Sequence, residues 1–571
     1  MNKRYDFSDH TDIAIVLSGE AGQGIKTLEY VLTRLLKKQG LNVFSCKEYM
    51  SRVRGGLNSI QIRISPEKVD AWVDRIDILI PLNPDLSRLE HRISSKTMII
   101  GEKEKITTKQ PVIEFSFQAA AEAAGGKKYA NTVASGLILS LLHVDPSLLD
   151  TYLSQKFVDK PQKIIDANLE AAKLGVKKGR ALVEKGVVKI QMVPVSKSDE
   201  KILVNGSQAV GMGAIAGGCD FVSSYPMSPG TGVLEFLAGQ SNAFSFVVEQ
   251  AEDEIAALNM VLGAWYAGAR GFATTSGGGF ALMGEAMSLA GITETPAVVH
   301  IAQRPGPATG LPTRTEQGDL NLALYSGHGD FVRAIFAPGN LDQAFYLTAN
   351  AFNLADAYQI PVLILTDQYL MDSAYTIPVW DLDPVSVKKG FVKTDSDYCR
   401  YRYTRNGLSP RGVPGYGKGL VCVDSDEHDE KGRITEDWKT REKMMKKRMK
   451  RLKVLEDKAL MPSVHGNPDG DIVVVAWGSP HNMVLSALQN AGNPRMKYLH
   501  FSQVYPLNPR VRDTIEGAKK LVLVENNYSG QFGDLLFKTF GRKMNEKILL
   551  SNGFPFSTEF LTRKFKKIQG D

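Results

Sequence analysis

Four acidic side chains lie near the start of a helix predicted over residues 253–267: Glu249, Glu252, Asp253 and Glu254. In that helix Glu254 shares one face with the apolar residues Leu258, Val261 and Trp265. A carboxyl group sheltered from water has a raised pKa and can share a proton with a bound molecule. Acids near a helix start are also favoured by the helix dipole, so a structural role is the alternative for each of the four.

Two further residues could bind an anionic ligand. Arg304 follows a predicted strand over residues 297–302, and α/β proteins bind ligands at the carboxyl ends of parallel strands. Its planar guanidinium suits a carboxylate. Ser228, in the turn YPMSP, could hydrogen-bond the same ligand. The alternatives are a structural ion pair for Arg304 and a turn that caps the next helix for Ser228.

Polar residues farther along the chain could line the entrance of the same ligand site: Thr309, Thr313, Arg314, His328 and Asp330. Arg314 or His328 could contact a second carboxylate at the far end of a ligand. A single histidine is, however, more often a structural residue.

Two glycine strings near the N-terminus could hold a phosphate. Gly19, Gly22 and Gly24 separate a predicted strand from a helix, whose first N–H groups could bind an anion. Their G-x-x-G-x-G spacing is not that of dinucleotide folds, and Lys26 comes too late for a P-loop. The string SRVRGGLNS places Gly55 and Gly56 after Arg52 and Arg54. A tight turn and an exposed hairpin without ligand are equally good explanations.

Length, net charge and hydrophobicity limit the class of protein to which the chain can belong. A chain of 571 residues is too long to fold around a single hydrophobic core, so three or four domains are expected. The net charge of +7 is mild, and only one segment is strongly basic, which argues against nucleic-acid binding. No apolar run reaches the roughly 18 residues of a membrane helix, and a signal-peptide core is absent. A cytoplasmic protein without membrane contact is therefore expected.

The four cysteines, Cys46, Cys219, Cys399 and Cys422, are widely scattered. Zinc and iron–sulfur sites need close cysteine pairs. We therefore expect this chain to hold no metal.

Alternating strand and helix patterns predict a multidomain α/β protein. The first region has predicted strands over residues 13–17, 43–46, 59–64, 76–80 and 97–100, and a mostly parallel sheet is expected. The second has predicted strands over residues 221–224, 244–248, 272–275, 297–302, 331–336 and 362–366. Buried strands are predicted again over residues 472–477 and 521–525.

The predicted domain boundaries lie where the pattern of strands and helices changes along the chain. They are an N-terminal domain over 1–185, a linker over 186–203, a second domain over 204–394, an insertion over 395–465 and a C-terminal domain over 466–571.

The insertion carries a basic segment over residues 439–458, preceded by an acidic tract over 424–430. A ferredoxin-docking or nucleic-acid role is conceivable for the basic segment, but a solvated amphipathic helix explains it better. Its apolar side is expected to hold Met444, Met445, Met449, Leu452 and Leu455. The acidic tract suggests metal binding, although an exposed loop is the commoner explanation.

Several ordered strings together resemble the 2-oxoacid:ferredoxin oxidoreductase family. The two N-terminal glycine strings resemble its gamma domain. The strings YPMSPGTG, QAEDEIAAL, TTSGGGFALM, QRPGPATGLPT, HGD and VENNYSGQ resemble its alpha subunit. The chain is therefore similar to a gamma–alpha fusion, of the 2-oxoglutarate:ferredoxin oxidoreductase kind, over nearly its whole length.

The resemblance implies three domain types: a gamma-type α/β domain, a pyrimidine-binding domain for thiamine diphosphate and a transketolase C-terminal-like domain. It singles out Glu254 as the carboxylate that hydrogen-bonds N1′ of the coenzyme. Other implied coenzyme contacts are Tyr225, Pro226, Gly277 and Gly278. The implied 2-oxoacid contacts are Ser228, Arg304, Thr313, Arg314 and His328. Coenzyme A is implied at Gly19, Gly22, Gly24, Arg54, Gly55 and Gly56. Serine at position 228, where the family usually has threonine, leaves the identity of the substrate open.

The chain lacks the G-D-G motif that precedes a Mg²⁺-diphosphate site, and it lacks cluster-binding cysteines. In the family, a beta subunit carries Mg²⁺, the diphosphate contacts and a [4Fe–4S] cluster. An αβ pair, doubled to α2β2, is therefore expected, with ferredoxin as electron acceptor.

The expected reaction is CoA-dependent oxidative decarboxylation of a 2-oxoacid, with 2-oxoglutarate favoured. The alternatives are pyruvate or branched-chain 2-oxoacids, or a non-catalytic assembly partner. A dinucleotide-dependent dehydrogenase would need a different glycine spacing. The direction of the reaction is left open.

Overall fold

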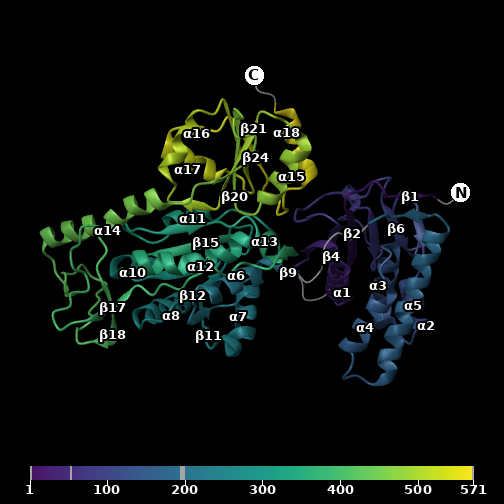
Figure 1. Ribbon diagram of the computed structural model, residues 1–571, viewed down its shortest axis with the longest axis horizontal. Helices are drawn as coiled ribbons and strands as arrows, with labels where there is room; N and C mark the ends of the chain where they lie inside the picture. Colours follow the sequence, from purple (N-terminus) through teal and green to yellow (C-terminus); the bar gives the residue numbers. More distant parts are fainter. Residues whose placement is uncertain (1–2, 52–54, 193–199, 569–571) are drawn as a thin grey trace. The chain divides into compact units, whose positions relative to one another are not determined.

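The computed structural model describes residues 3–51, 55–192 and 200–568. The chain divides into two compact units. The first consists of the residues up to Val204 together with Ser373–Val379. The second consists of Asn205–Asp372 and the residues from Trp380 onward. Each unit has its own sheet and helices (Figure 1). Among the described helices, none combines the length and apolar character that crossing a bilayer requires.

The elements of the first unit are β1 (Tyr5–Asp6), β2 (Ile13–Ala21), α1 (Ile25–Lys38), β3 (Asn42–Glu48), β4 (Gly55–Ser65), β5 (Ile78–Pro81), η1 (Glu90–Arg92), β6 (Met98–Gly101), β7 (Val112–Glu114), α2 (Phe117–Ala123), η2 (Lys127–Tyr129), α3 (Ala130–Leu141), α4 (Pro146–Lys156), α5 (Gln162–Glu184), β8 (Val188–Lys189), β9 (Lys201–Asn205) and β16 (Ala374–Pro378). All five strands predicted for this region are confirmed.

The main sheet of the first unit has the strand order β7-β6-β5-β2-β4-β3-β16-β9. The expectation of a mostly parallel sheet is wrong, because β4 pairs antiparallel with both β2 and β3. The connection from β3 to β4 is too short for the crossover that a parallel pair requires. The edge beside β3 is completed by β16, so the predicted range 204–394 includes one strand that belongs to the first unit.

The elements of the second unit are α6 (Gly206–Ala216), β10 (Phe221–Ser224), α7 (Thr231–Phe244), β11 (Val247–Gln250), α8 (Glu254–Tyr266), β12 (Gly271–Thr275), α9 (Gly277–Leu282), α10 (Gly284–Thr293), β13 (Ala297–Gln303), α11 (Leu320–Tyr325), β14 (Ala334–Phe336), α12 (Leu341–Tyr358), β15 (Pro361–Asp367), α13 (Gln368–Asp372), β17 (Phe391–Thr394), β18 (Arg411–Gly417), α14 (Trp438–Lys458), β19 (Ser463–Gly466), β20 (Ile472–Trp477), α15 (His481–Ala491), β21 (Met496–Phe501), β22 (Gln503–Tyr505), η4 (Pro509–Val511), α16 (Arg512–Glu516), β23 (Lys520–Glu525), α17 (Gln531–Phe540), β24 (Glu546–Leu549) and α18 (Thr558–Lys567).

The larger sheet of this unit has the order β11-β10-β12-β13-β15-β14-β22, and only β22 among these strands runs antiparallel. The carboxyl ends of β10 to β13 therefore share one edge. The predicted strands are confirmed, except that the one expected over 244–248 begins at Val247 and the one expected over 331–336 begins at Ala334. Helix α7 continues to Phe244, and Ser245 ends it in a left-handed conformation with φ of 56°.

A smaller sheet, β19-β21-β20-β23-β24, forms the C-terminal part of the second unit. Its predicted strands over 472–477 and 521–525 are confirmed as β20 and β23. The segment that follows β21 returns to the larger sheet as β22, beside β14. The two sheets are thus joined through β22.

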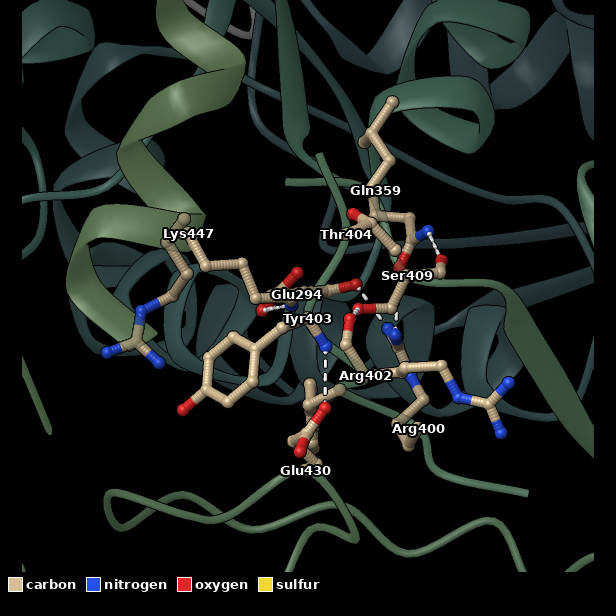
Figure 2. A network of polar contacts seen from close by, with 12 residues as sticks. Glu294, Gln359, Arg400, Arg402, Tyr403, Thr404, Ser409, Glu430 and Lys447 are labelled. Atoms are coloured by element: carbon tan, nitrogen blue, oxygen red, sulfur yellow. Dashed lines mark hydrogen bonds and ion pairs between the residues drawn. The ribbon is translucent and has the colours of Figure 1, made fainter. Parts of the chain in front are cut away.

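Helix α14 is the predicted basic helix, but the side that it buries is not purely apolar. Its buried residues are Met444, Lys447, Arg448, Arg451 and Leu455. Lys447 Nζ lies 2.6 Å from the buried carboxylate of Glu294, and Arg451 lies 3.4 Å from it. Figure 2 shows Lys447 and Arg400 reaching Glu294, whose carbonyl accepts a 2.7 Å hydrogen bond from Arg400. Burial would raise the pKa of Glu294, but the three cations lower it to about 2.

The acidic tract over 424–430 also has a structural role. Glu427 pairs with Arg448 and Arg441 of α14, at 2.7 and 2.6 Å. His428 is buried and packs against the ring of Tyr401, with ring centroids 3.9 Å apart. Glu430 accepts a 2.8 Å hydrogen bond from the backbone N–H of Tyr403 (Figure 2). The tract therefore holds α14 in place.

The Glu294 contacts predict a large loss of stability on neutralisation. Glu294→Gln would leave Lys447 and Arg451 buried without a full counter-charge, at a cost of about 3–5 kcal/mol. Glu442→Gln is the matched control, because Glu442 pairs with Lys446 on the exposed side of α14 and such pairs contribute less than about 1 kcal/mol. Thermal unfolding of the full chain measures both, and equal melting temperatures for the two variants would contradict the prediction.

Candidate active site

Glu254 is the buried acid of the four predicted candidates. It is 3% exposed and begins α8, while Glu249 and Glu252 are exposed. Asp253 caps the helix by accepting a 2.8 Å hydrogen bond from Ala256 N–H. The expected face of Leu258, Val261 and Trp265 is buried below Glu254. Helix capping thus explains Asp253 but does not explain a buried Glu254.

One oxygen of Glu254 is left for a ligand. Its Oε1 is buried and has no hydrogen-bond partner in the structure. A Cβ atom on Gly279 would lie 2.5 Å from this oxygen, so the glycine is needed to admit the carboxylate. Buried polar atoms are nearly always paired, and an unpaired one calls for a missing partner. Glu254 Oε1 is therefore available to a hydrogen-bonding group of a bound molecule.

The turn at the start of α9 contains the predicted glycines Gly277 and Gly278. Gly278 is open, since a Cβ there would have only the carbonyl of Ala308 nearby, at 4.0 Å. Ser276 is buried at the same turn, and its Oγ has no hydrogen-bond partner. Glycine backbone with a nearby unpaired hydroxyl suits a ligand that approaches the main chain closely.

Arg304 and Ser228, two of the predicted ligand contacts, lie together through a main-chain hydrogen bond. Arg304 Nη1 donates a 2.8 Å hydrogen bond to the carbonyl of Ser228. The Ser228 side chain and Tyr225 are exposed, and Pro226 is half-buried beside them. Gly230, in the same turn, packs against the end of β12. The ends of β10, β12 and β13 thus place these residues at the edge that holds Glu254.

A buried hydrogen-bonded row crosses the sheet beneath this edge. His300 on β13 contacts Thr274 on β12 at 2.8 Å and Thr366 on β15 at 2.7 Å. Burial lowers the pKa of His300 to about 3, so the ring is neutral and structural. Gln303 donates to the carbonyl of Thr366 and accepts a 3.0 Å hydrogen bond from Asp319 N–H. This row fixes the ends of three strands relative to one another.

Asp319 lies at the same site, although the sequence did not point to it. Its Oδ2 is buried and has no hydrogen-bond partner. Burial raises the pKa of Asp319 to about 6, partly offset by the charge of Arg304. The Gly-Asp pair ahead of an apolar run looks like a helix cap in the sequence, which hid this residue.

The other predicted ligand contacts lie in different surroundings. Thr313 is half-buried in the loop after β13. The Arg314 guanidinium lies over the ring of Phe554, 4.7 Å from its centroid. His328 is exposed and lines a separate cavity of about 400 Å³ with Asp330, Glu427 and Arg448. None of the residues lining that cavity comes from the strand ends around Glu254, so the structure does not bring His328 to this site.

In the first unit, the two predicted glycine strings lie side by side. Strand β2 pairs with β4 so that Ala21 faces Gly55 and Gly19 faces Asn58. Gly22, Gly24 and Gly56 have φ values of 94°, 75° and 78°, which favour glycine. Arg54 lies outside the described residues.

Two hollows meet at Gly22. One, of about 470 Å³, is lined by Gln23, Asn131, Lys127 and Lys128 among others. The second, of about 350 Å³, is lined by Gly24, Lys26, Lys47, Tyr49 and Met50 among others. Lysines beside the open backbone of Gly22 could bind a phosphorylated ligand, and Glu20, Glu48 and Glu102 line the same hollows.

A metal site was not expected in this chain. Within the described residues, no group of three or more histidine, cysteine, aspartate or glutamate side chains is placed to hold a metal ion.

The site residues fit the coenzyme that the resemblance implies. Thiamine diphosphate presents a pyrimidine nitrogen that needs a buried carboxylate, and Glu254 Oε1 is buried and unpaired. The open Gly278 and the unpaired Ser276 hydroxyl leave room and a polar contact beside it.

Known proteins are similar to this chain in sequence. Residues 212–447 match the family of pyruvate flavodoxin/ferredoxin oxidoreductase thiamine diphosphate-binding domains, and residues 14–178 match the pyruvate ferredoxin/flavodoxin oxidoreductase family. A 2-oxoacid:ferredoxin oxidoreductase subunit alpha from Sulfolobus sp is 29% identical, over 97% of both chains. The 2-oxoglutarate synthase subunit KorA of Methanothermobacter marburgensis is 33% identical, over 58% of this chain and 90% of its own length.

A solved structure is similar over almost the whole chain. It is the 2-oxoglutarate:ferredoxin oxidoreductase from Magnetococcus marinus, with 2-oxoglutarate, coenzyme A and succinyl-CoA bound. The TM-score is 0.91 at 29% identity, and the match covers 98% of this chain and 100% of the other.

The contact of Gly279 with Glu254 predicts that alanine at position 279 destabilises the protein more than alanine at position 278. Gly279→Ala forces the Glu254 carboxylate and Thr275 to move, and we expect a loss of about 1–3 kcal/mol in stability. Gly278→Ala is the matched control, because its methyl group meets open space and the helix favours alanine. Thermal unfolding without added ligand measures both changes. A Gly279→Ala variant as stable as Gly278→Ala would show that the carboxylate is not held there.

Proposed function

The chain belongs to the 2-oxoacid:ferredoxin oxidoreductase family, and we propose that it is the subunit that binds the 2-oxoacid and activates the coenzyme. The proposed reaction is oxidative decarboxylation of the 2-oxoacid to its acyl-CoA and CO₂, with reduction of ferredoxin. The proposal depends on one observation, the buried and unpaired carboxylate oxygen of Glu254.

Glu254 would hold or accept a proton at Oε1 against the pyrimidine ring of thiamine diphosphate. When bound, that coenzyme supplies the electron sink for loss of CO₂. The apolar face beneath Glu254 shelters the carboxyl group from water. Gly277 and Gly278 would let the coenzyme approach the backbone, with Tyr225 and Pro226 beside it.

The 2-oxoacid would be held by Arg304 and Ser228. The guanidinium of Arg304 is anchored on the Ser228 carbonyl through Nη1, which leaves its other N–H groups for a carboxylate. The exposed hydroxyl of Ser228 can hydrogen-bond the same carboxylate or the keto oxygen. Thr313, in the loop that follows, would line the entrance.

We favour 2-oxoglutarate as the substrate. The support is that the solved relative binds 2-oxoglutarate and that one relative is a 2-oxoglutarate synthase subunit. Arg314, stacked on Phe554, carries a positive charge that could meet the distal carboxylate. Pyruvate and branched-chain 2-oxoacids remain alternatives, because serine replaces the usual threonine at position 228. A purely assembling partner would have no use for an unpaired buried acid.

Coenzyme A would bind at the glycine strings of the first unit. The hollows around Gly22 offer Lys26, Lys47, Lys127 and Lys128 to phosphate groups. The solved relative has coenzyme A bound. The backbone of Gly22 is open to a ligand, because an added Cβ there would meet nothing within 4 Å.

A beta subunit would complete the site. Exposed apolar side chains lie on the segments that carry the site, with Tyr225 after β10 at 40%, Ile255 on α8 at 49% and Leu282 on α9 at 51%. Such a patch beside a site marks a surface that a partner covers. We expect that subunit to supply Mg²⁺, the diphosphate contacts and a [4Fe–4S] cluster, in an α2β2 assembly that reduces ferredoxin.

The first test is Glu254→Gln in the complex of this chain with its beta subunit. We expect turnover to fall by at least about 10²-fold, because an amide cannot exchange the proton. Reduction of a viologen dye measures turnover, with CoA and either 2-oxoglutarate, pyruvate or a branched-chain 2-oxoacid as substrate.

Glu252→Gln is the control for this test, because Glu252 is exposed at the same helix start. Near-normal turnover is expected for it. The role of Glu254 would be rejected if its variant turned over normally while still assembling with the beta subunit.

The coenzyme A proposal predicts a change in one kinetic constant. Lys26→Ala removes a cation beside the open glycines, and we expect the KM for CoA to rise roughly ten-fold while the KM for the 2-oxoacid is unchanged. Lys38→Ala, at the other end of α1, is the control. An unchanged KM for CoA in the Lys26 variant would place the phosphates elsewhere.

A further inference from the structure

Asp319 contacts the same glycine turn as Glu254. A methyl group on Gly277 would overlap the Asp319 carboxylate, just as one on Gly279 would crowd Glu254. Each of these acids has a buried oxygen without a hydrogen-bond partner, Oδ2 of Asp319 and Oε1 of Glu254. The turn between them also holds the unpaired Ser276 hydroxyl. Two carboxyls therefore contact one short piece of backbone, and the proposed function uses only one of them.

Helix capping does not explain Asp319. It occupies the N-cap position of α11, yet its side chain accepts no cap hydrogen bond. Its backbone N–H instead donates to Gln303, at the end of β13. Gln531 on α17 donates to the carbonyl of Gly318 and accepts from Asn321 N–H, so both sides of Asp319 are fixed by side chains of other elements. The carboxylate is thus positioned by its surroundings while it stabilises none of them.

Arg304 is the cation that acts on this carboxylate. The two side chains influence each other's pKa, although they form no ion pair within 4.0 Å among the described residues. Two other acids lie nearby: Glu316, whose pKa is raised by burial and by Asp319, and Glu254, which contacts the same glycine turn. The glycine turn contributes no charge, and Gln531 is neutral. Asp319 therefore depends on Arg304 alone for a compensating charge.

We propose that Asp319 is a positioning residue that shares Arg304 with the 2-oxoacid and takes up a proton when the 2-oxoacid binds. This inference rests on the proposed function, since it assigns Arg304 to the carboxylate of the substrate. Before binding, the Asp319 anion orients the guanidinium through its charge. After binding, a second anion faces the same guanidinium, and the Asp319 carboxylate, whose Oδ2 is buried, then becomes protonated from solvent.

The proposed proton uptake determines how the affinity for the 2-oxoacid changes with pH. Burial raises the pKa of Asp319 to about 6 in the free chain, so the carboxyl is mostly ionised at neutral pH. A bound carboxylate raises this pKa further, because it neutralises Arg304 and adds negative charge. A ligand that raises a pKa binds more tightly at low pH, and its affinity falls as the pH rises between the free and bound values. The KM for the 2-oxoacid should therefore rise with pH, whereas kcat need not follow.

The test uses the assembled complex with coenzyme and ligands that keep the 2-oxoacid carboxylate but resist loss of CO₂, namely N-oxalylglycine and oxamate. Calorimetric titration at pH 7.5 in two buffers of different ionisation enthalpy counts the protons taken up. We expect the wild-type complex to take up between about 0.5 and 1 proton, and its dissociation constant to weaken by up to about ten-fold per pH unit above pH 6.5. Asp319→Asn should take up almost none and should bind with little dependence on pH.

Glu316→Gln is the matched control and should keep the proton uptake. Asp319→Ser serves as a second variant in case the asparagine side chain disturbs folding, with melting temperatures checked for each protein. Equal uptake in wild type and both Asp319 variants, or none in wild type, would overturn the inference. Failure of the proposed function would look different, as a wild-type complex that reduces no dye with any 2-oxoacid.

Discussion

The site depends on keeping a carboxylate buried and unpaired at the carboxyl edge of a parallel sheet. Desolvation of a carboxyl is costly, and a fold usually offsets the cost with hydrogen bonds to the group. Here one oxygen of Glu254 has no hydrogen-bond partner, while the neighbouring Asp253 performs the capping that a helix start requires. Helix capping does not require such an acid, and this unpaired oxygen is the observation on which the proposed coenzyme role depends.

The surrounding structure is built to hold that edge rigid. The row from Thr274 through His300 to Thr366 ties three strands together at one level. From the C-terminal sheet, Asn527 donates to the carbonyl of Gln317, and Gln317 donates to the carbonyl of Trp477. At the far end of the unit, Glu294 and its cations secure α14. Each of these networks is fully within the second unit, and each fixes backbone without using a site residue.

The sequence predicted those parts of the fold that local pattern determines. The buried strands of both sheets and the helix that begins at Glu254 follow from apolar spacing, and the resemblance identified the family. The mixed sheet of the first unit was missed, because strand direction depends on pairing between distant segments. The buried cations of α14 were missed too, since Lys447 and Arg451 look solvated until Glu294 is placed opposite them. Asp319 was hidden by its position, which is that of an ordinary helix cap.

Strand β16 has a consequence for the history and handling of this chain. The polypeptide passes from one unit to the other after Val204, returns at Ser373 and leaves again after Val379. A fragment cut at Val204 would keep the helices of the first unit but would lose β16, which pairs with one edge of β3. An unpaired strand edge invites association with other chains. A free-standing relative of the first unit would need another way to cover β3, so joining the two polypeptides end to end does not by itself account for the present fold.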